Sequence, residues 1–238
     1  MKSQTLNLLK KEIKLGNSLQ TTIWFVCCFG MYFIPSYPVY IGPFYITLSI
    51  MMTFALNQVS HDMLYTVLLP VRKIDTVKAR FLFCGALEII SFVFAIIVGI
   101  IRRSPDYPPN LSGVGITVAY LGLQFILYAI FNFLYLGNVY KNPLKTGKYY
   151  LVAAFAYFGF YALFELPVWI YMGVKKNNPD ALLTQGMSLA KVGQIFSAND
   201  NTFLLQQCII LFIGLIIFAL SWKITFNRAA RQFEKYDM

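Results

Sequence analysis

Six long apolar stretches constrain this chain more than any other feature of its sequence. A helix that crosses a membrane needs about 20 predominantly apolar residues, because no water is present there to satisfy backbone polar groups. Of the 238 residues, 58% are hydrophobic and 13% are charged, whereas soluble domains carry about a quarter charged residues. The sequence therefore predicts an all-α, polytopic membrane protein with six transmembrane helices, at Leu19–Ile34, Val39–Asn57, Phe81–Ile101, Val114–Asn138, Tyr149–Val174 and Phe203–Trp222.

The distribution of basic residues predicts the orientation of these helices. Fifteen of the 20 Lys and Arg residues lie in the amino-terminal segment, the loops after the second and fourth spans, and the carboxyl-terminal tail. The other five lie in the loops after the third and fifth spans. Cytoplasmic segments of membrane proteins carry such an excess of Lys and Arg. Both termini are therefore expected in the cytoplasm, and the net charge of +10 does not require a nucleic-acid partner.

Two cytoplasmic segments of the single transmembrane domain, residues 1–238, are predicted to form further helices. Residues 1–17 form either an interfacial helix on the inner leaflet or a simple basic anchor. The loop 58–80 is far longer than a turn between two spans requires. Within it, Ser60 can cap a short helix that Pro70 ends. This helix would rest on lipid or provide a docking surface for another protein.

A third segment, residues 175–202, is expected to form an extracellular helical hairpin before the last span. Asn178 is a suitable helix cap, and the proline that follows fits the first helical position. A second short helix is expected around residues 188–196. Both helices are only modestly polar, which suits a hairpin that dips into the outer leaflet.

Polar side chains inside the predicted spans form a candidate path for a substrate. Glu88 and Glu165 are the clear acids, and an ionisable residue costs about 2.5–3.5 kcal/mol at the centre of a membrane helix. Tyr, Asn and Gln side chains recur beside them at helical spacing. They line a path for an amphipathic substrate or form hydrogen bonds between helices. The candidates are Glu88, Tyr120, Gln124, Tyr128, Asn132, Tyr135, Tyr157, Tyr161 and Glu165.

The sequence lacks the common catalytic motifs. His61 is the only histidine, which excludes the H-E-x-x-H zinc motif and multi-His metal sites, and no G-x-S-x-G motif occurs. A phosphate-binding loop around Gly147-Lys148 would need glycine in place of Asn142 and Ser or Thr in place of Tyr149. We therefore expect no enzyme activity, no catalytic or metal-ligating residue and no cofactor bound by this chain.

Three short motifs give the chain a resemblance to a known family. They are Leu8-Leu9-Lys10-Lys11-Glu12-Ile13-Lys14, the segment from His61-Asp62 to Leu68-Leu69-Pro70-Val71-Arg72-Lys73, and Val77-Lys78-Ala79-Arg80-Phe81. Together with the order of the helices, they resemble the permease subunits of type-2 ATP-binding-cassette (ABC) exporters. More narrowly, the chain is similar to the small bacterial permeases that include the phenol-soluble-modulin exporters.

The resemblance implies a half-transporter in the plasma membrane of a bacterium. A second copy, or a paralogous permease, would complete the pathway for amphipathic peptides or similar hydrophobic compounds. A separate ATPase subunit would bind ATP and Mg. The helix from Ser60 to Leu69 would be the coupling helix that contacts this ATPase. The residues implied for that contact are Ser60, His61, Asp62, Leu64, Tyr65, Leu68, Arg72 and Lys73.

Two other functions remain open from the residues alone. An ion- or proton-coupled secondary carrier would use Glu88 and Glu165 and would need no ATPase. A non-transporting membrane scaffold would bind a partner through the loop 58–80 but would move no substrate. The three hypotheses therefore differ in what drives transport. The exporter uses ATP, the carrier uses an ion gradient, and the scaffold transports nothing.

Overall fold

The computed structural model describes residues 2–16, 18–35, 37–68, 70–104, 107–108, 113–177, 188–199 and 201–235. Within these ranges the secondary structure is helical and contains no strand, which confirms the predicted all-α class. The elements are α1 (Lys2–Gly16), α2 (Leu19–Tyr32), α3 (Ile41–Val59), α4 (Asp62–Leu68), α5 (Lys73–Ile101), α6 (Val118–Leu134), α7 (Leu136–Val139), η1 (Pro143–Lys145), α8 (Thr146–Asn177), α10 (Leu189–Ser197), η2 (Asn201–Phe203) and α11 (Leu204–Glu234).

Four helical segments in the described part of the chain are long and apolar enough to cross a membrane. They are α5, α6 with α7, α8 with its preceding 3₁₀ turn, and α11. Helices α2 and α3 form where two further spans were predicted, but neither is among these four. The 14 residues of α2 rise only about 21 Å, whereas the hydrocarbon core is about 30 Å thick. The six-span count therefore stays a prediction.

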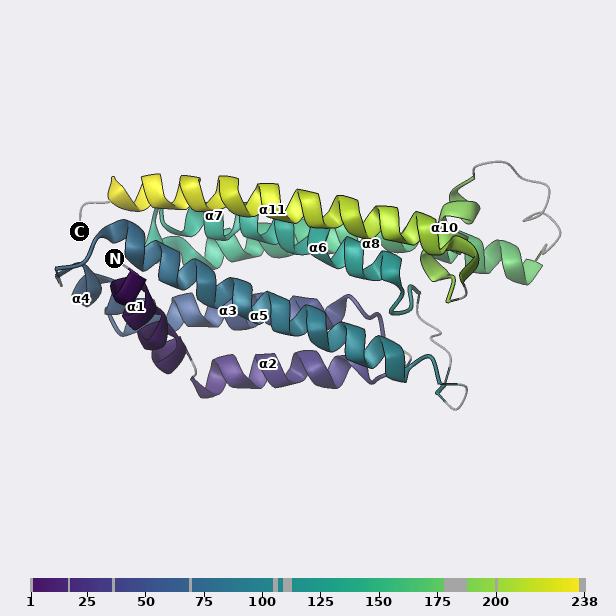
Figure 1. The fold of residues 1–238 in the computed structure, drawn as a ribbon, viewed down its shortest axis with the longest axis horizontal. Coiled ribbons are helices and arrows are strands. Elements are labelled where there is room, and N and C mark those ends of the chain that lie inside the picture. Colours follow the sequence, from purple (N-terminus) through teal and green to yellow (C-terminus); the bar gives the residue numbers. More distant parts are fainter. Residues whose placement is uncertain are drawn as a thin grey trace.

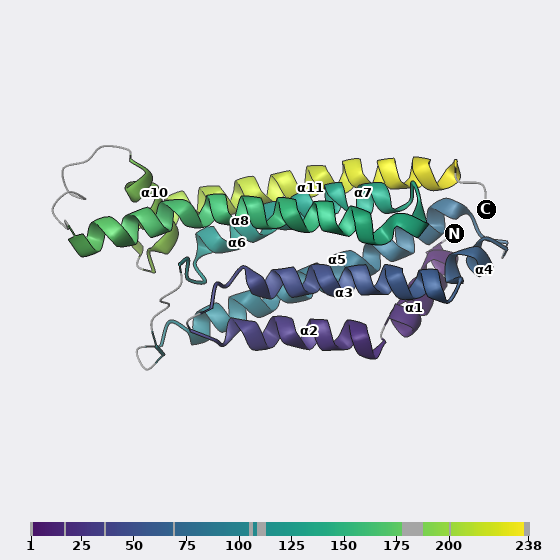
Figure 2. The ribbon, with the colours of Figure 1, turned by 180° about the vertical axis from the view of Figure 1, so that it is seen from behind.

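The long helices run roughly along one axis and form an elongated bundle (Figure 1). Helices α6, α8 and α11 pack together on one side, and α2, α3 and α5 on the other (Figure 2). The first residues of α1 and the last residues of α11 lie at the same end as α4, and α10 lies at the opposite end against α8. We call these the α4 end and the α10 end. This arrangement is compatible with the two termini on one side of a membrane.

Two helices extend well beyond the predicted membrane segments at the α4 end. Helix α5 begins at Lys73, eight residues before the predicted start of the span at Phe81, and α11 continues to Glu234. The extra turns of α11, after the predicted end at Trp222, are held by packing, because Ala229, Ala230 and Phe233 are buried. An apolar run therefore marks where a helix can meet lipid, whereas its ends depend on what the polar turns contact.

Helices α6 and α11 approach each other through two glycines. A Cβ atom on Gly122 would lie 2.6 Å from the carbonyl oxygen of Ile210 and 2.7 Å from Cα of Leu211. A Cβ atom on Gly214 would overlap the backbone of Gly122. Small residues permit such backbone contact between membrane helices, where association depends on close packing rather than on the hydrophobic effect.

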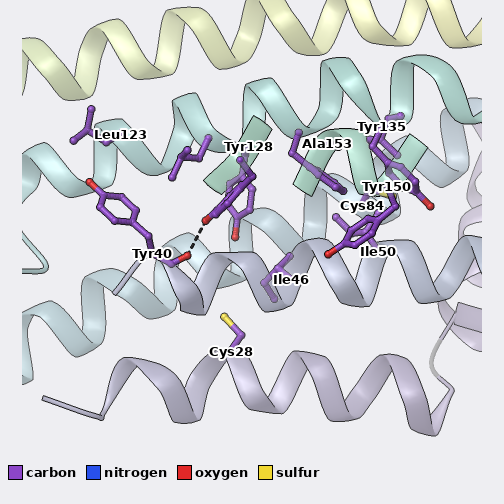
Figure 3. Packing of buried hydrophobic residues seen from close by; sticks show 14 of the residues in the cluster. Cys28, Tyr40, Ile46, Ile50, Cys84, Leu123, Tyr128, Tyr135, Tyr150 and Ala153 are labelled. Atoms are coloured by element: carbon purple, nitrogen blue, oxygen red, sulfur yellow. Dashed lines mark hydrogen bonds between the residues drawn. The ribbon is translucent and has the colours of Figure 1, made fainter. Parts of the chain in front are cut away.

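Buried tyrosines fill much of the space between the two groups of helices. Tyr40, Tyr128, Tyr135 and Tyr150 lie between α3 and the helices α6 and α8 (Figure 3). Tyr135 stacks on Phe131, with ring centroids 5.2 Å apart, and meets Tyr150 edge to face at 5.9 Å. Aromatic pairs in these geometries add about 0.5–1.5 kcal/mol beyond the apolar area that they bury. The two halves of the bundle are therefore joined by large rings with polar hydroxyls.

At the α10 end, only part of the predicted hairpin is described. The first helix, expected from Asn178 towards Gly186, lies outside the described residues. The second, expected around 188–196, is α10, and the Ser188 side chain accepts a hydrogen bond from the backbone N–H of Lys191. Helix α10 packs on α8 so closely that a Cβ atom on Gly193 would overlap the carbonyl of Pro167. The hairpin as a whole stays a prediction.

Candidate functional site

The short helix α4 protrudes at one end of the bundle between α3 and α5. Ser60 does not cap α4 as predicted, because it ends α3 and its hydroxyl donates to the carbonyl of Asn57 at 3.4 Å. His61 follows with φ of 51° and turns the chain, so that α4 begins at Asp62. A non-glycine residue rarely adopts this left-handed conformation, and histidine is among the residues that tolerate it best. The helix then ends at Leu68, two residues before Pro70, as predicted.

A buried arginine connects α4 to two other helices. Arg80 on α5 is 1% exposed, and its guanidinium donates to both carboxylate oxygens of Glu12 on α1, at 2.9 and 3.0 Å. Its Nη2 also donates to Asp62 on α4 at 3.3 Å. The guanidinium carbon lies 5.2 Å from the ring centroid of Phe54, a distance at which a cation is attracted to an aromatic face. Arg80 therefore holds α1, α4 and α5 together.

A second cation completes this group of charges, which we call the Arg80 cluster: Lys11, Glu12, Asp62, Thr66 and Arg80. The ammonium of Lys11 forms an ion pair with Asp62 at 2.8 Å and donates to the hydroxyl of Thr66. Thr66 in turn donates to the backbone carbonyl of Asp62 at 2.7 Å. The cluster contains two cations and two carboxylates, so its formal charges balance.

The Arg80 cluster makes the position of α4 depend on α1 and α5. Desolvating a charge is costly, and a buried carboxylate is tolerated only when it is paired and hydrogen-bonded. If α4 moved alone, Asp62 would lose its contacts with both Lys11 and Arg80. A movement of α4 is therefore expected to carry α1 and the first turns of α5 with it.

The residues predicted for the ATPase contact fall into two groups. Asp62 is 9% exposed and faces the cluster, whereas His61, Tyr65 and Leu68 are exposed, the last two by 64% and 75%. The side chain of Leu64 lies outside the described residues. Tyr65 and Leu68 therefore remain the strongest candidates for a direct contact, and Asp62 acts on the inner side of α4.

Arg72 and Lys73 lie at the start of α5 rather than on α4. Arg72 donates from Nε and Nη2 to the two carboxylate oxygens of Asp75, at 2.9 and 3.2 Å. This hydrogen bonding and the negative charge of Asp75 raise the pKa of Arg72. The ammonium of Lys73 lies 6.0 Å from the ring centroid of Phe233 on α11. Arg72 therefore binds within the first turn of α5, and Lys73 contacts α11.

Sequence reasoning missed four members of the Arg80 cluster as parts of this site. Lys11 and Glu12 lie in the segment predicted as an interfacial helix or basic anchor, and Arg80 lies at the end of the loop 58–80, without a predicted contact. In α1, Leu8 and Glu12 are buried against the rest of the chain, whereas Leu6 and Ile13 are about half exposed. One signal was available, because Glu12 is the only acid among the first 60 residues.

The candidate path residues on α6 meet other helices in a buried hydrogen-bond network. Tyr128 donates to the hydroxyl of Ser91 on α5 at 3.0 Å, and Gln124 donates to the same hydroxyl at 3.4 Å. Tyr120 donates to the hydroxyl of Tyr32 on α2 at 3.2 Å, and these side chains are fully buried. Within this chain, the polar stripe of α6 therefore faces α2 and α5 rather than lipid.

Glu88 and Glu165 lie in different places. Asn132 donates to Glu88 Oε2 at 3.1 Å between α5 and α6, and the other carboxylate oxygen of Glu88 is buried with no hydrogen-bond partner in the described part of the chain. Glu165 on α8 instead accepts from the backbone N–H of Val114, at 3.1 Å, near the α10 end. The two acids therefore do not form one site.

The remaining path candidates also pack within the bundle. Tyr157 donates to the backbone carbonyl of Tyr40 at 2.8 Å, and Tyr161 meets the ring of Tyr40 edge to face at 5.5 Å. Tyr135 belongs to the aromatic contacts between α3, α6 and α8 described above. These contacts join different helices of the bundle.

Comparison with known proteins identifies the family. The sequence model of a family described as ABC-2 family transporter protein matches residues 7–228. No curated protein and no solved structure matches the chain significantly. The matched range extends from α1 through α4 and the apolar helices into the last turns of α11. Because the match covers most of the chain and includes the Arg80 cluster, the protein belongs to the ABC-2 family of transporter proteins.

Proposed function

We propose that this ABC-2 permease is the membrane-spanning subunit of an ATP-driven exporter and that a separate ATPase subunit docks on α4. Family membership supports the membrane permease and the partner ATPase. The observation that carries the docking proposal is the two-sided character of α4. Its outward side exposes Tyr65 and Leu68, whereas its inward side is anchored by Asp62 in the Arg80 cluster.

In this proposal, ATP and Mg bind to the partner and a push on α4 is the signal that reaches the permease. The Arg80 cluster transmits the displacement to α5, which continues as one helix from Lys73 to Ile101. A helix of 29 residues is about 44 Å long, so its far end lies across the membrane from α4. A small tilt at the α4 end therefore shifts the α10 end as well.

We place the α4 end in the cytoplasm of a bacterium, with the α10 end outside the plasma membrane. The excess of Lys and Arg in the segments at the α4 end supports this orientation. Two copies of the chain, or this chain with a paralogous permease, complete the pathway. Exposed apolar side chains along α5, α8 and α11 supply surface for lipid and for such pairing.

The proposed cargo is an amphipathic peptide or a similar hydrophobic compound, as in the phenol-soluble-modulin exporters that the chain resembles. The network around Ser91, Tyr128 and Gln124 offers hydroxyl and amide groups without a fixed charge. Since these groups are buried between α2, α5 and α6, cargo reaches them only if these helices separate during the cycle. Such a separation is the movement that a tilt of α5 would produce.

Replacing both Tyr65 and Leu68 by alanine tests the docking site. We expect the ATPase to bind about tenfold more weakly or worse, because large exposed side chains at a docking surface carry much of its binding energy. Co-purification of the ATPase would show the loss, and inside-out vesicles would lose ATP-dependent uptake of an amphipathic helical peptide. The permease itself should elute normally, since neither side chain is buried.

Leu144→Ala is the matched control, because Leu144 is 71% exposed in η1 at the start of α8. This variant should keep both the ATPase and the transport activity. Normal binding and transport by the double α4 variant would refute docking on α4. Retained ATPase binding without uptake of the peptide by the wild-type protein would instead reject the cargo class.

Glu165→Gln separates the exporter from a proton-coupled carrier. The carboxylate accepts one backbone hydrogen bond from Val114, and the amide oxygen of glutamine can accept the same bond. The exporter proposal therefore predicts ATP-dependent uptake within about twofold of wild type, whereas a carrier that moves protons through Glu165 would stop. Uptake driven by a pH gradient without ATPase, and abolished in this variant, would favour the carrier.

A further inference from the structure

A basic cavity lies at the end of the bundle opposite α4, where α5 and α8 end and α10 packs. Its volume is about 290 Å³. Three of the residues that line it are cationic: Arg102 and Arg103, which directly follow α5, and Lys175 in the last turn of α8. Ser197, the last residue of α10, and Asn199 just after it add neutral polar groups. No acidic residue is among the described residues that line this cavity.

Arg102 is the most enclosed of the three cations. Its Nη1 donates to the backbone carbonyl of Tyr32 at 3.4 Å, and its guanidinium carbon lies 5.3 Å from the ring centroid of Tyr107. Its Nη2 is buried and has no hydrogen-bond partner within the described ranges. Burial lowers the pKa of Arg102, yet an arginine stays charged in proteins. The guanidinium therefore retains a donor that an anion could use.

The helix ends account for part of this arrangement. A cation near the carboxyl end of a helix interacts favourably with the helix dipole, which applies to Arg102 on α5 and to Lys175 on α8. The dipole does not explain why cations from two helices line the same cavity. Within the described residues, no carboxylate forms an ion pair with Arg102, Arg103 or Lys175. Among the described residues, these three cations are therefore without an ion-pair partner, and the Glu165 carboxylate lies against Gly113, another residue that lines the cavity.

We propose that this cavity binds a phosphate oxyanion through Arg102 and Lys175. Arginine suits phosphate because its planar group offers parallel N–H donors, and lysine adds a compact charge. The site lies at one end of apolar helices that cross the membrane, so the phosphate of a phospholipid headgroup is one source. Free inorganic phosphate is the other. The inference does not depend on the proposed export function, because binding can be measured without an ATPase or a cargo.

The test uses the full chain in an uncharged detergent. Thermal unfolding would be followed with inorganic phosphate, with short-chain phosphatidylglycerol and with an uncharged diacylglycerol of the same chain length. We expect at least one phosphate-bearing probe to raise the unfolding temperature and the diacylglycerol to have no such effect. In Arg102→Gln and in Lys175→Gln, the fitted dissociation constant should rise about tenfold, as expected for the loss of one charged hydrogen bond.

Two further variants keep the result interpretable. Lys148→Gln removes an exposed cation at the start of α8, at the α4 end, and should leave the dissociation constant unchanged. Arg102→Lys keeps the charge and should bind more tightly than Arg102→Gln. Protection by phosphatidylglycerol alone would identify a lipid site, and equal protection by inorganic phosphate a site for the free ion. Failure of both probes to bind, or binding that is the same in Lys175→Gln, would overturn the proposal.

Discussion

Replacing Arg80 by methionine is expected to cost about 3–5 kcal/mol of the free energy of unfolding, the usual loss when one partner of a buried ion pair is removed. Arg80 donates to both oxygens of Glu12 and to Asp62, and it is 1% exposed. Methionine has a similar length but no charge. Glu12 would therefore stay buried without its cation. Thermal unfolding of the detergent-solubilised permease, with and without ATPase, measures the loss.

Two comparisons show whether the effect comes from the buried charges. In the double variant Arg80→Met with Glu12→Gln, the stranded carboxylate is neutralised, so part of the stability should return and the two changes should not be additive. Arg72→Met removes an arginine whose side chain is 56% exposed in its pair with Asp75, and this change should matter little. Equal losses at Arg80 and Arg72 would show that the Arg80 cluster does not hold α1, α4 and α5 together.

Gly122→Ala is the second change with a large expected effect. The added Cβ would lie 2.6 Å from the carbonyl oxygen of Ile210, and the atoms it meets belong to the backbone of α11. Backbone cannot rotate away as a side chain can, so the two helices must move apart. We expect a loss of about 3 kcal/mol, at the upper end of the range for overpacked sites. Unfolding by heat or denaturant, followed by size-exclusion chromatography, provides the measurement.

Gly159→Ala is the matched control on α8. Apart from its chain neighbours and the backbone of its own helix, nothing lies within 4 Å of a Cβ at this position, and alanine is favoured over glycine within a helix by about 1 kcal/mol. This variant should therefore be as stable as the wild type or slightly more so. If Gly122→Ala were equally harmless, the contact between α6 and α11 through Gly122 and Gly214 would not exist in the membrane.

The sequence alone was sufficient for the helical class and for the positions of the longest helices. Four apolar runs form helices long enough to cross a membrane. Because lipid offers no hydrogen-bond partners, the backbone N–H and C=O groups of such a run must pair with each other, as they do in a helix. The helix before Pro70 was predicted from the proline that stops it, and a short helix was expected around residues 188–196, where α10 forms. The family resemblance was also carried by short local motifs, and the family match confirms it at the level of ABC-2 transporters.

Only the tertiary structure showed which polar residues meet. Glu12 and Arg80 are 68 positions apart, and no periodicity in one helix reports on a partner in another. The same applies to Ser91, which joins Tyr128 and Gln124 from α6, and to Gly122, which meets α11. Apolar runs and the residues that stop or cap helices can be recognised from the sequence because they act within a few turns, whereas the ends of α5 and α11 also depend on packing. The pairing of buried charges and the contact of two backbones depend on how the helices pack, which only the folded chain decides.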